Sequence, residues 1–210
     1  MTIEHLAQSE HAARSARRVL ALTQLSFFLA LVWCITIDHS AIAETDGISF
    51  YGVYHRTILI LLVGYSIAAL GLWRVSSYYA DAGAPAPMVG GTRAVGLGLF
   101  ALLATPYNQG TFLNWTHMIA GVVMALVQLA IAIALVARQR TALALVAFAV
   151  QFGGGLLAAA SLPSWHFPYL LLGEMIYEVG FGIILFVWIG SLARAGEPIR
   201  ASYDSERTIE

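Results

Sequence analysis

The chain has very few charged residues for its length and no lysine at all. Of its 210 residues, 11% are charged and 59% are hydrophobic, and the mean hydropathy is +0.76. A soluble domain carries about 25% charged residues, so this composition excludes a water-soluble globule and predicts that a bilayer solvates the apolar surface. The net charge of −1 leaves no basic footprint for nucleic acid, and we expect no nucleic-acid partner.

The chain is equally poor in cysteine. Its single thiol, Cys34, excludes an internal disulfide, a Cys-X-X-Cys redox pair and a thiolate cluster. Because Cys34 lies inside the first apolar run, we expect it to be a small buried apolar residue.

Long apolar runs are what the sequence has instead. A membrane helix needs about 20 mostly apolar residues. Five such runs are clear, at residues 19–37, 57–76, 115–137, 141–160 and 169–192. A further run, at 94–107, has only 14 residues, a length that also suits a buried or re-entrant segment.

The placement of arginine favours a sixth span. If the short run crosses the membrane, ten of the 11 basic residues lie on one side and only Arg56 lies on the other, which is the positive-inside pattern. If it does not cross, Arg138 and Arg140 change sides and the pattern is lost. The sequence therefore predicts an all-α, polytopic membrane protein with six transmembrane helices and both termini in the cytoplasm.

The same reading divides the chain into three parts. These are a cytoplasmic arm (1–17), a six-helix transmembrane domain (18–194) and a cytoplasmic tail (195–210). Arginine is the only basic residue besides histidine, which is typical of a GC-rich bacterial source. We therefore expect a multi-pass protein of the plasma membrane, which in such a bacterium is the inner membrane.

The first apolar run also has the parts of a secretory signal peptide. Arg17 and Arg18 precede it and Ala41-Ile42-Ala43 follow it. Its 19 residues exceed the roughly 7–15 of a signal-peptide core, so we expect a membrane helix. Cleavage after residue 43 stays an alternative that would leave the topology of the later helices unchanged.

Several glycines are placed to let membrane helices approach closely. Lipid supplies no hydrophobic drive for helix association, so small residues mark the contact faces. We expect such faces on the third, fifth and sixth helices, at Gly96, Gly98, Gly153, Gly154, Gly155, Gly180 and Gly182.

Two carboxylates lie inside the last apolar run. Ionisable groups in a bilayer are costly and mark functional sites. Glu174 and Glu178 are four residues apart and so share one helix face. They lie about 7–8 Å and about 13–14 Å below the outer edge, where an unpaired charge would cost several kcal/mol.

The predicted topology gathers polar groups around these acids. Arg56 and His55 open the second helix and His117 enters the fourth, all in the outer half with Glu174. We expect an outward-facing polar pocket. Its candidate residues are His55, Arg56, Asn114, His117, Glu174, Tyr177 and Glu178.

A purely structural interpretation of the same residues stays open. In it, Arg56 and Glu174 form a buried ion pair that sets the helix register, and His117 is hydrogen-bonded to Glu178. Gln128 and Gln151 lie deeper in the predicted bundle and are expected to form interhelical hydrogen bonds.

Three functions fit the expected pocket. In the first, a lipid- or envelope-associated protein places Arg56 on a phosphorylated headgroup. In the second, an intramembrane metal-dependent hydrolase uses His55, His117, Glu174 and Glu178 as metal ligands. In the third, a haem-binding electron carrier uses His55 and His117 as axial ligands. The sequence leaves the cofactor and enzyme status open. Membrane lipids are the expected partners, and the scaffold also suits an accessory subunit with a membrane-protein partner.

Short motifs resemble a known family. The block 47–52 (Gly-Ile-Ser-Phe-Tyr-Gly) precedes the second helix, His117 opens the fourth, and Gly173-Glu174 with Tyr177-Glu178 open the sixth. These residues resemble an uncharacterised six-helix bacterial group related to the DRAM/Sfk-like membrane proteins. The resemblance covers most of the helical core and implies a role in organising or handling membrane lipids.

Overall fold

The computed structural model describes residues 3–43, 46–162 and 167–194. In these ranges the chain is helical, with six helices long and apolar enough to cross a membrane. The predicted all-α, six-span membrane architecture is confirmed. The elements are α1 (Ile3–Ile37), α2 (Ser40–Ala43), the 3-10 helix η1 (Ile48–Gly52), α3 (Ile58–Asp81), α4 (Ala86–Ala104), α5 (Thr111–Gln139), α6 (Ala142–Ala160) and α7 (Leu170–Arg194).

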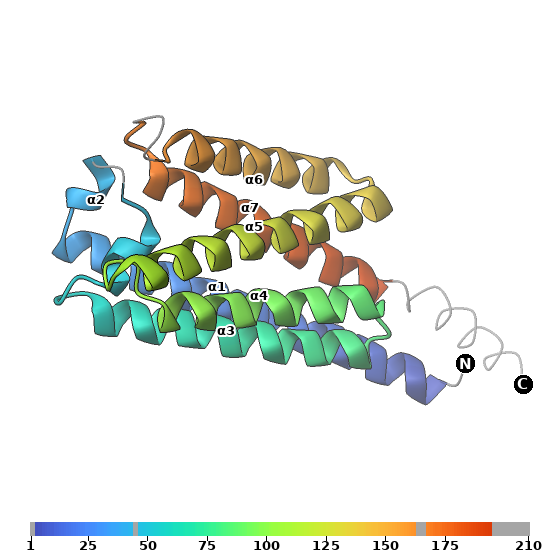
Figure 1. The fold of residues 1–210 in the computed structure, drawn as a ribbon. Helices are drawn as coiled ribbons and strands as arrows, with labels where there is room; N and C mark the ends of the chain where they lie inside the picture. Colours follow the sequence, from blue (N-terminus) through green and yellow to red (C-terminus); the bar gives the residue numbers. More distant parts are fainter. Residues whose placement is uncertain (1–2, 44–45, 163–166, 195–210) are drawn as a thin grey trace, which may run out of the picture.

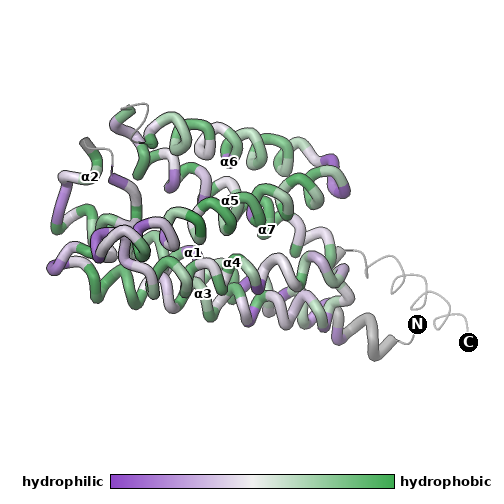
Figure 2. Tube along the Cα trace, viewed as in Figure 1, coloured by the Kyte–Doolittle hydropathy of each residue, from purple (hydrophilic) through white to green (hydrophobic). Residues whose placement is uncertain are grey.

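The six long helices form one elongated bundle (Figure 1). α1 packs against α3 and α7, α3 packs against α4, α4 against α5, and α6 packs along α7. The short elements α2 and η1 lie at the end of the bundle where α3, α5 and α7 begin (Figure 1), which is the predicted outer end. Hydrophobic residues dominate the middle of the helices, and hydrophilic ones gather mostly toward the two ends (Figure 2).

The third span differs most from its predicted limits. It begins at Ala86 instead of residue 94 and ends at Ala104 instead of residue 107. Pro85 is its N-cap and a second proline follows in the first turn, where proline is tolerated because the helix has no partner for those N–H groups. The Ala-, Gly- and Pro-rich residues 86–91 therefore form the first turns of a 19-residue span.

The predicted N-terminal arm is not separate from the first span. α1 continues from Ile3 to Ile37, and Ala13 and Ala16 belong to the buried core. Cys34, also in α1, is fully buried as predicted. The predicted cytoplasmic tail, 195–210, lies outside the described residues.

The expected close approach of the last two helices is confirmed at particular glycines. A Cβ added to Gly154 would lie 2.5 Å from the backbone nitrogen of Tyr177, and one added to Gly180 would lie 2.5 Å from the backbone nitrogen of Gln151. At Gly96 a Cβ would lie 3.0 Å from the carbonyl oxygen of Ala69, where α4 crosses α3. These positions hold helix backbones in direct contact.

Two adjacent glycines of α6 provide a matched test of this packing. Gly154→Ala should destabilise the purified protein by about 1–3 kcal/mol, because the methyl group overpacks the α6–α7 contact. Gly153→Ala should be neutral or slightly stabilising, since a Cβ there meets nothing within 4 Å and alanine is the better helix former. Thermal unfolding in detergent measures both. Equal melting temperatures for the two variants would contradict the packing.

Candidate functional site

The first acid of α7 holds the short helix η1 in place. Oε2 of Glu174 accepts a hydrogen bond from the backbone N–H of Ile48 at 2.6 Å. The first N–H groups of a helix have no partner within the helix, and Gly47, the N-cap of η1, offers no side chain to cap them. A Cβ on Gly47 would lie 2.5 Å from the same carboxylate oxygen, so a larger residue there would displace the end of the Glu174 side chain.

The second acid is paired with an amide. Nε2 of Gln128, on α5, donates to both carboxylate oxygens of Glu178, at 3.0 and 3.1 Å. This confirms Gln128 as an interhelical hydrogen-bonding residue. Gln151 is fully buried, and its side chain interacts with the Tyr177 hydroxyl on α7, outside the usual limits of hydrogen-bond geometry.

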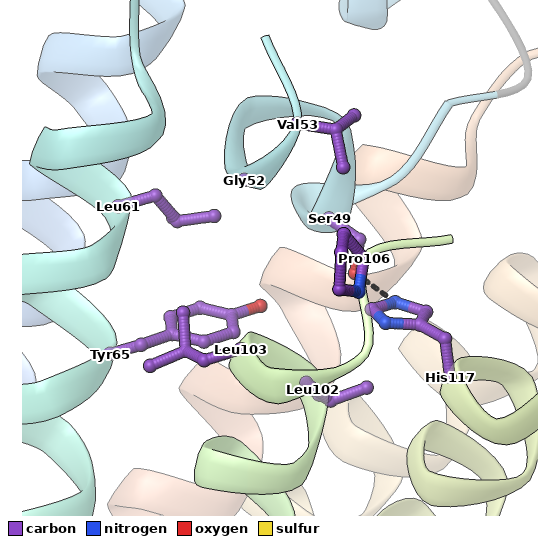
Figure 3. Close-up of a pocket in the computed structure, with 9 residues that line it drawn as sticks. All are labelled: Ser49, Gly52, Val53, Leu61, Tyr65, Leu102, Leu103, Pro106 and His117. Atoms are coloured by element: carbon purple, nitrogen blue, oxygen red, sulfur yellow. Dashed lines mark hydrogen bonds between the residues drawn. The ribbon is translucent and has the colours of Figure 1, made fainter. Parts of the chain in front are cut away.

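His117 bridges three elements at the outer end of the bundle. Its Nδ1 lies 2.6 Å from the carbonyl oxygen of Thr105, just after α4, and its Nε2 lies 2.8 Å from Oγ of Ser49 in η1 (Figure 3). Because a carbonyl oxygen can only accept, Nδ1 must carry a proton. In the neutral ring the Nε2 lone pair therefore accepts the hydroxyl proton of Ser49.

The predicted cationic partner of the acids lies elsewhere. Arg56 and His55 are both exposed in the turn before α3, and no ion pair joins a described basic residue to Glu174 or Glu178. The predicted Arg56–Glu174 pair and the predicted His117–Glu178 hydrogen bond are therefore wrong. A backbone N–H and a glutamine amide satisfy the carboxylates instead, and they do so without a second buried charge.

Two further residues of the expected pocket, Tyr177 and Asn114, do not line the cavity beside His117 that is described below. The hydroxyl of Tyr177 donates to the carbonyl oxygen of Ala125 on α5, so it joins α7 to α5. Asn114 is half-buried in the first turn of α5.

The expected metal ligands are not brought together. The described residues contain no group of three or more His, Cys, Asp or Glu side chains that could hold a metal ion, so His55, His117, Glu174 and Glu178 do not assemble as a ligand set. The two histidines also differ in their surroundings, because His55 is exposed while both ring nitrogens of His117 are hydrogen-bonded.

A small cavity adjoins His117. Its volume is about 20 Å³, enough for one water molecule. Ser49, Tyr65 and His117 supply its polar lining, and Leu61, Leu102 and Pro106 are among its apolar walls (Figure 3). The sequence reasoning included Ser49 only as part of a motif and missed Tyr65, because nothing in the apolar sequence of α3 indicates which way that tyrosine faces.

Polar groups beside η1 are bonded to their own segment. The hydroxyl of Tyr51 donates to the carbonyl oxygen of Asp38 at 3.1 Å, and burial raises the pKa of Tyr51 to about 12, so this donor keeps its proton at neutral pH. The Asp38 carboxylate accepts the backbone N–H of Ser40 at 2.8 Å. Hydrogen bonding to Ser40 lowers the pKa of Asp38. Tyr51 thus ties η1 to Asp38, which directly follows α1.

A larger groove lies at the opposite, predicted inner half of the bundle. It has a volume of about 410 Å³ between α1 and α7, with one contribution from α6. Among its lining side chains only Gln24 is polar. The lining residues are Leu20, Ala21, Gln24, Phe28, Leu143, Val179, Gly182, Ile183, Phe186 and Val187.

The hydrogen bond between α7 and η1 predicts a matched pair of variants. Glu174→Ala should raise amide hydrogen exchange across 47–52, because it removes a charged-group hydrogen bond of about 1.5–3 kcal/mol. Arg56→Ala should leave exchange in this segment unchanged, since that side chain is exposed. Hydrogen-exchange mass spectrometry in detergent measures both variants. Increased exchange in Arg56→Ala but not in Glu174→Ala would contradict the hydrogen bond from Ile48 to Glu174 and would support an Arg56–Glu174 ion pair instead.

Comparisons of the chain with family models, with curated proteins and with solved structures each find no match.

Proposed function

We propose that this integral membrane protein binds phospholipid, with an acyl chain of a cytoplasmic-leaflet lipid in the groove between α1 and α7 and the lipid phosphate at Arg17. This makes it a lipid-associated protein of the plasma membrane. A lipid role agrees with what the resemblance to DRAM/Sfk-like proteins implies. The observation that carries the proposal is an apolar groove with a cation at its predicted cytoplasmic mouth.

The groove has the dimensions of one leaflet. Along α1 it runs from Leu20 to Phe28 and along α7 from Val179 to Val187, in each case nine residues that span about 12 Å of helix. Half of the hydrocarbon core is about 15 Å thick. The volume of about 410 Å³ falls within the range of about 300–1,000 Å³ found for small-molecule sites.

The charge at the mouth suits a phosphate. The guanidinium carbon of Arg17 lies 4.3 Å from the centre of the Phe186 ring, and Phe186 lines the groove. Stacking holds the planar guanidinium over the aromatic face. Arg17 is exposed and stands one turn before Leu20, on the predicted cytoplasmic side of the groove. Arginine binds phosphate through two parallel hydrogen bonds.

The shape of the groove depends on a missing side chain. Gly182 lies opposite Gln24, whose side-chain carbon would be 3.1 Å from a Cβ built on the glycine. The exposed side chains Ala21, Val179 and Ile183 border the opening toward lipid. An acyl chain therefore enters laterally from the bilayer, with Gln24 the polar side chain that it meets.

Phospholipid retained through purification tests the proposal. Native mass spectrometry of the wild-type protein in a mild detergent with added phosphatidylglycerol should show a one-lipid complex. Arg17→Gln should weaken that complex by about tenfold, because it removes charge-assisted hydrogen bonds worth about 1.5–3 kcal/mol.

Arg74 offers the matched control. It is also exposed and its guanidinium carbon lies 4.7 Å from the centre of the Tyr78 ring, but Tyr78, unlike Phe186, does not line the groove. Arg74→Gln should retain lipid as the wild type does. Equal loss of phospholipid in both variants would show that the effect is one of nonspecific charge. Unchanged retention in Arg17→Gln would contradict a phosphate site at Arg17.

A further inference from the structure

The outer end of the bundle holds an arrangement that lipid binding at the inner half does not use. Ser49 and His117 come from segments 68 positions apart in the chain and meet at 2.8 Å between Oγ and Nε2. A serine hydroxyl bonded to an imidazole whose other nitrogen is oriented by a third group is the pattern of an activated nucleophile. We propose that Ser49 is a nucleophile, that His117 is its general base, and that the substrates are carboxylic esters of acyl lipids.

The orientation of His117 supports its role as a base. The Thr105 carbonyl fixes the proton on Nδ1 at 2.6 Å, so the free lone pair of the neutral ring is on Nε2, facing Ser49. A buried carboxylate performs this orienting task in serine proteases; here a backbone carbonyl, which cannot titrate, does so. Thr105 is thus a positioning residue that acts through His117.

The cavity beside this pair provides room for a reacting atom. Its volume of about 20 Å³ fits one water molecule or one carbonyl oxygen, and Ser49, His117 and Tyr65 all line it (Figure 3). The Tyr65 hydroxyl is directed into the space between them (Figure 3). A tyrosine O–H at that position is a donor for a developing oxyanion. Nucleophile, base and oxyanion donor therefore surround one site.

The depth of the site defines the substrate class. η1 lies where α3, α5 and α7 begin (Figure 1), at the predicted outer boundary of the hydrocarbon, which is the level of the ester linkages of membrane lipids. Leu61, Leu102 and Pro106 make the surroundings of the cavity apolar, as the acyl side of a lipid ester linkage is. An ester with one long acyl chain and a polar alcohol matches this position, with the alcohol toward the aqueous face.

The reaction is a balanced hydrolysis. Ser49 Oγ bonds to the ester carbonyl carbon while its proton passes to His117 Nε2, and the carbonyl oxygen becomes an oxyanion beside Tyr65. Collapse breaks the bond to the alcohol, which leaves with the proton from His117. Water then attacks the acyl-serine and gives a proton to His117. The fatty acid leaves, and the proton returns to Ser49.

Labelling by an alkyl fluorophosphonate tests the proposal on the full chain in detergent. The probe should form a covalent adduct that peptide mapping places on Ser49. Ser49→Ala should abolish it, and His117→Gln should slow it by at least about 100-fold, because glutamine keeps a side-chain hydrogen bond but takes up no proton. Hydrolysis of a short-chain p-nitrophenyl ester should fall in parallel.

Ser161→Ala is the control. Ser161 is buried at the same predicted end of the bundle, with its hydroxyl bonded to the Leu157 carbonyl, and its loss should leave labelling unchanged. Melting temperatures establish that each variant is folded. Absence of an adduct on Ser49 in folded protein, or equal labelling of wild type and His117→Gln, would overturn the proposal without touching phospholipid binding at Arg17.

Discussion

The structure depends on the pairing of the two α7 carboxylates with hydrogen-bond donors of the protein itself. In hydrocarbon an unpaired carboxylate costs several kcal/mol. Glu174 meets this constraint by accepting the Ile48 N–H at 2.6 Å, and Glu178 meets it through the Gln128 amide. The arginines Arg17 and Arg56 are exposed instead. Because the first of these bonds crosses from α7 to η1, it fixes a short loop helix against the bundle.

The outer and inner halves of the bundle present different groups. At the outer half, η1 presents Ser49 to His117, whose ring the Thr105 carbonyl orients. At the inner half, α1 and α7 diverge around a groove with Arg17 at its mouth. The proposed ester reaction and the proposed phospholipid binding therefore belong to separate sites in opposite halves of the bundle.

The fold was largely predictable from sequence because hydrophobic length and arginine bias determine a membrane topology almost alone. The start of α4 was not predictable from the sequence, because Pro85 and the nearby glycines indicate a loop unless they lie in the first turns of a helix. The candidate site was predicted only in part. Charge complementarity favoured Arg56 as the partner of Glu174, but no sequence pattern states that a backbone N–H will face a carboxylate 126 positions away.

Photo-crosslinking tests the lipid-binding claim most directly. A phosphatidylglycerol with a diazirine in one acyl chain is activated in vesicles containing the protein, and peptide mass spectrometry maps the adducts. Adducts are expected to concentrate on the groove residues Gln24, Phe28 and Ile183 and to fall in Arg17→Gln. Adducts spread equally over the groove and the exposed α6 residues Val146 and Leu156 would contradict the account.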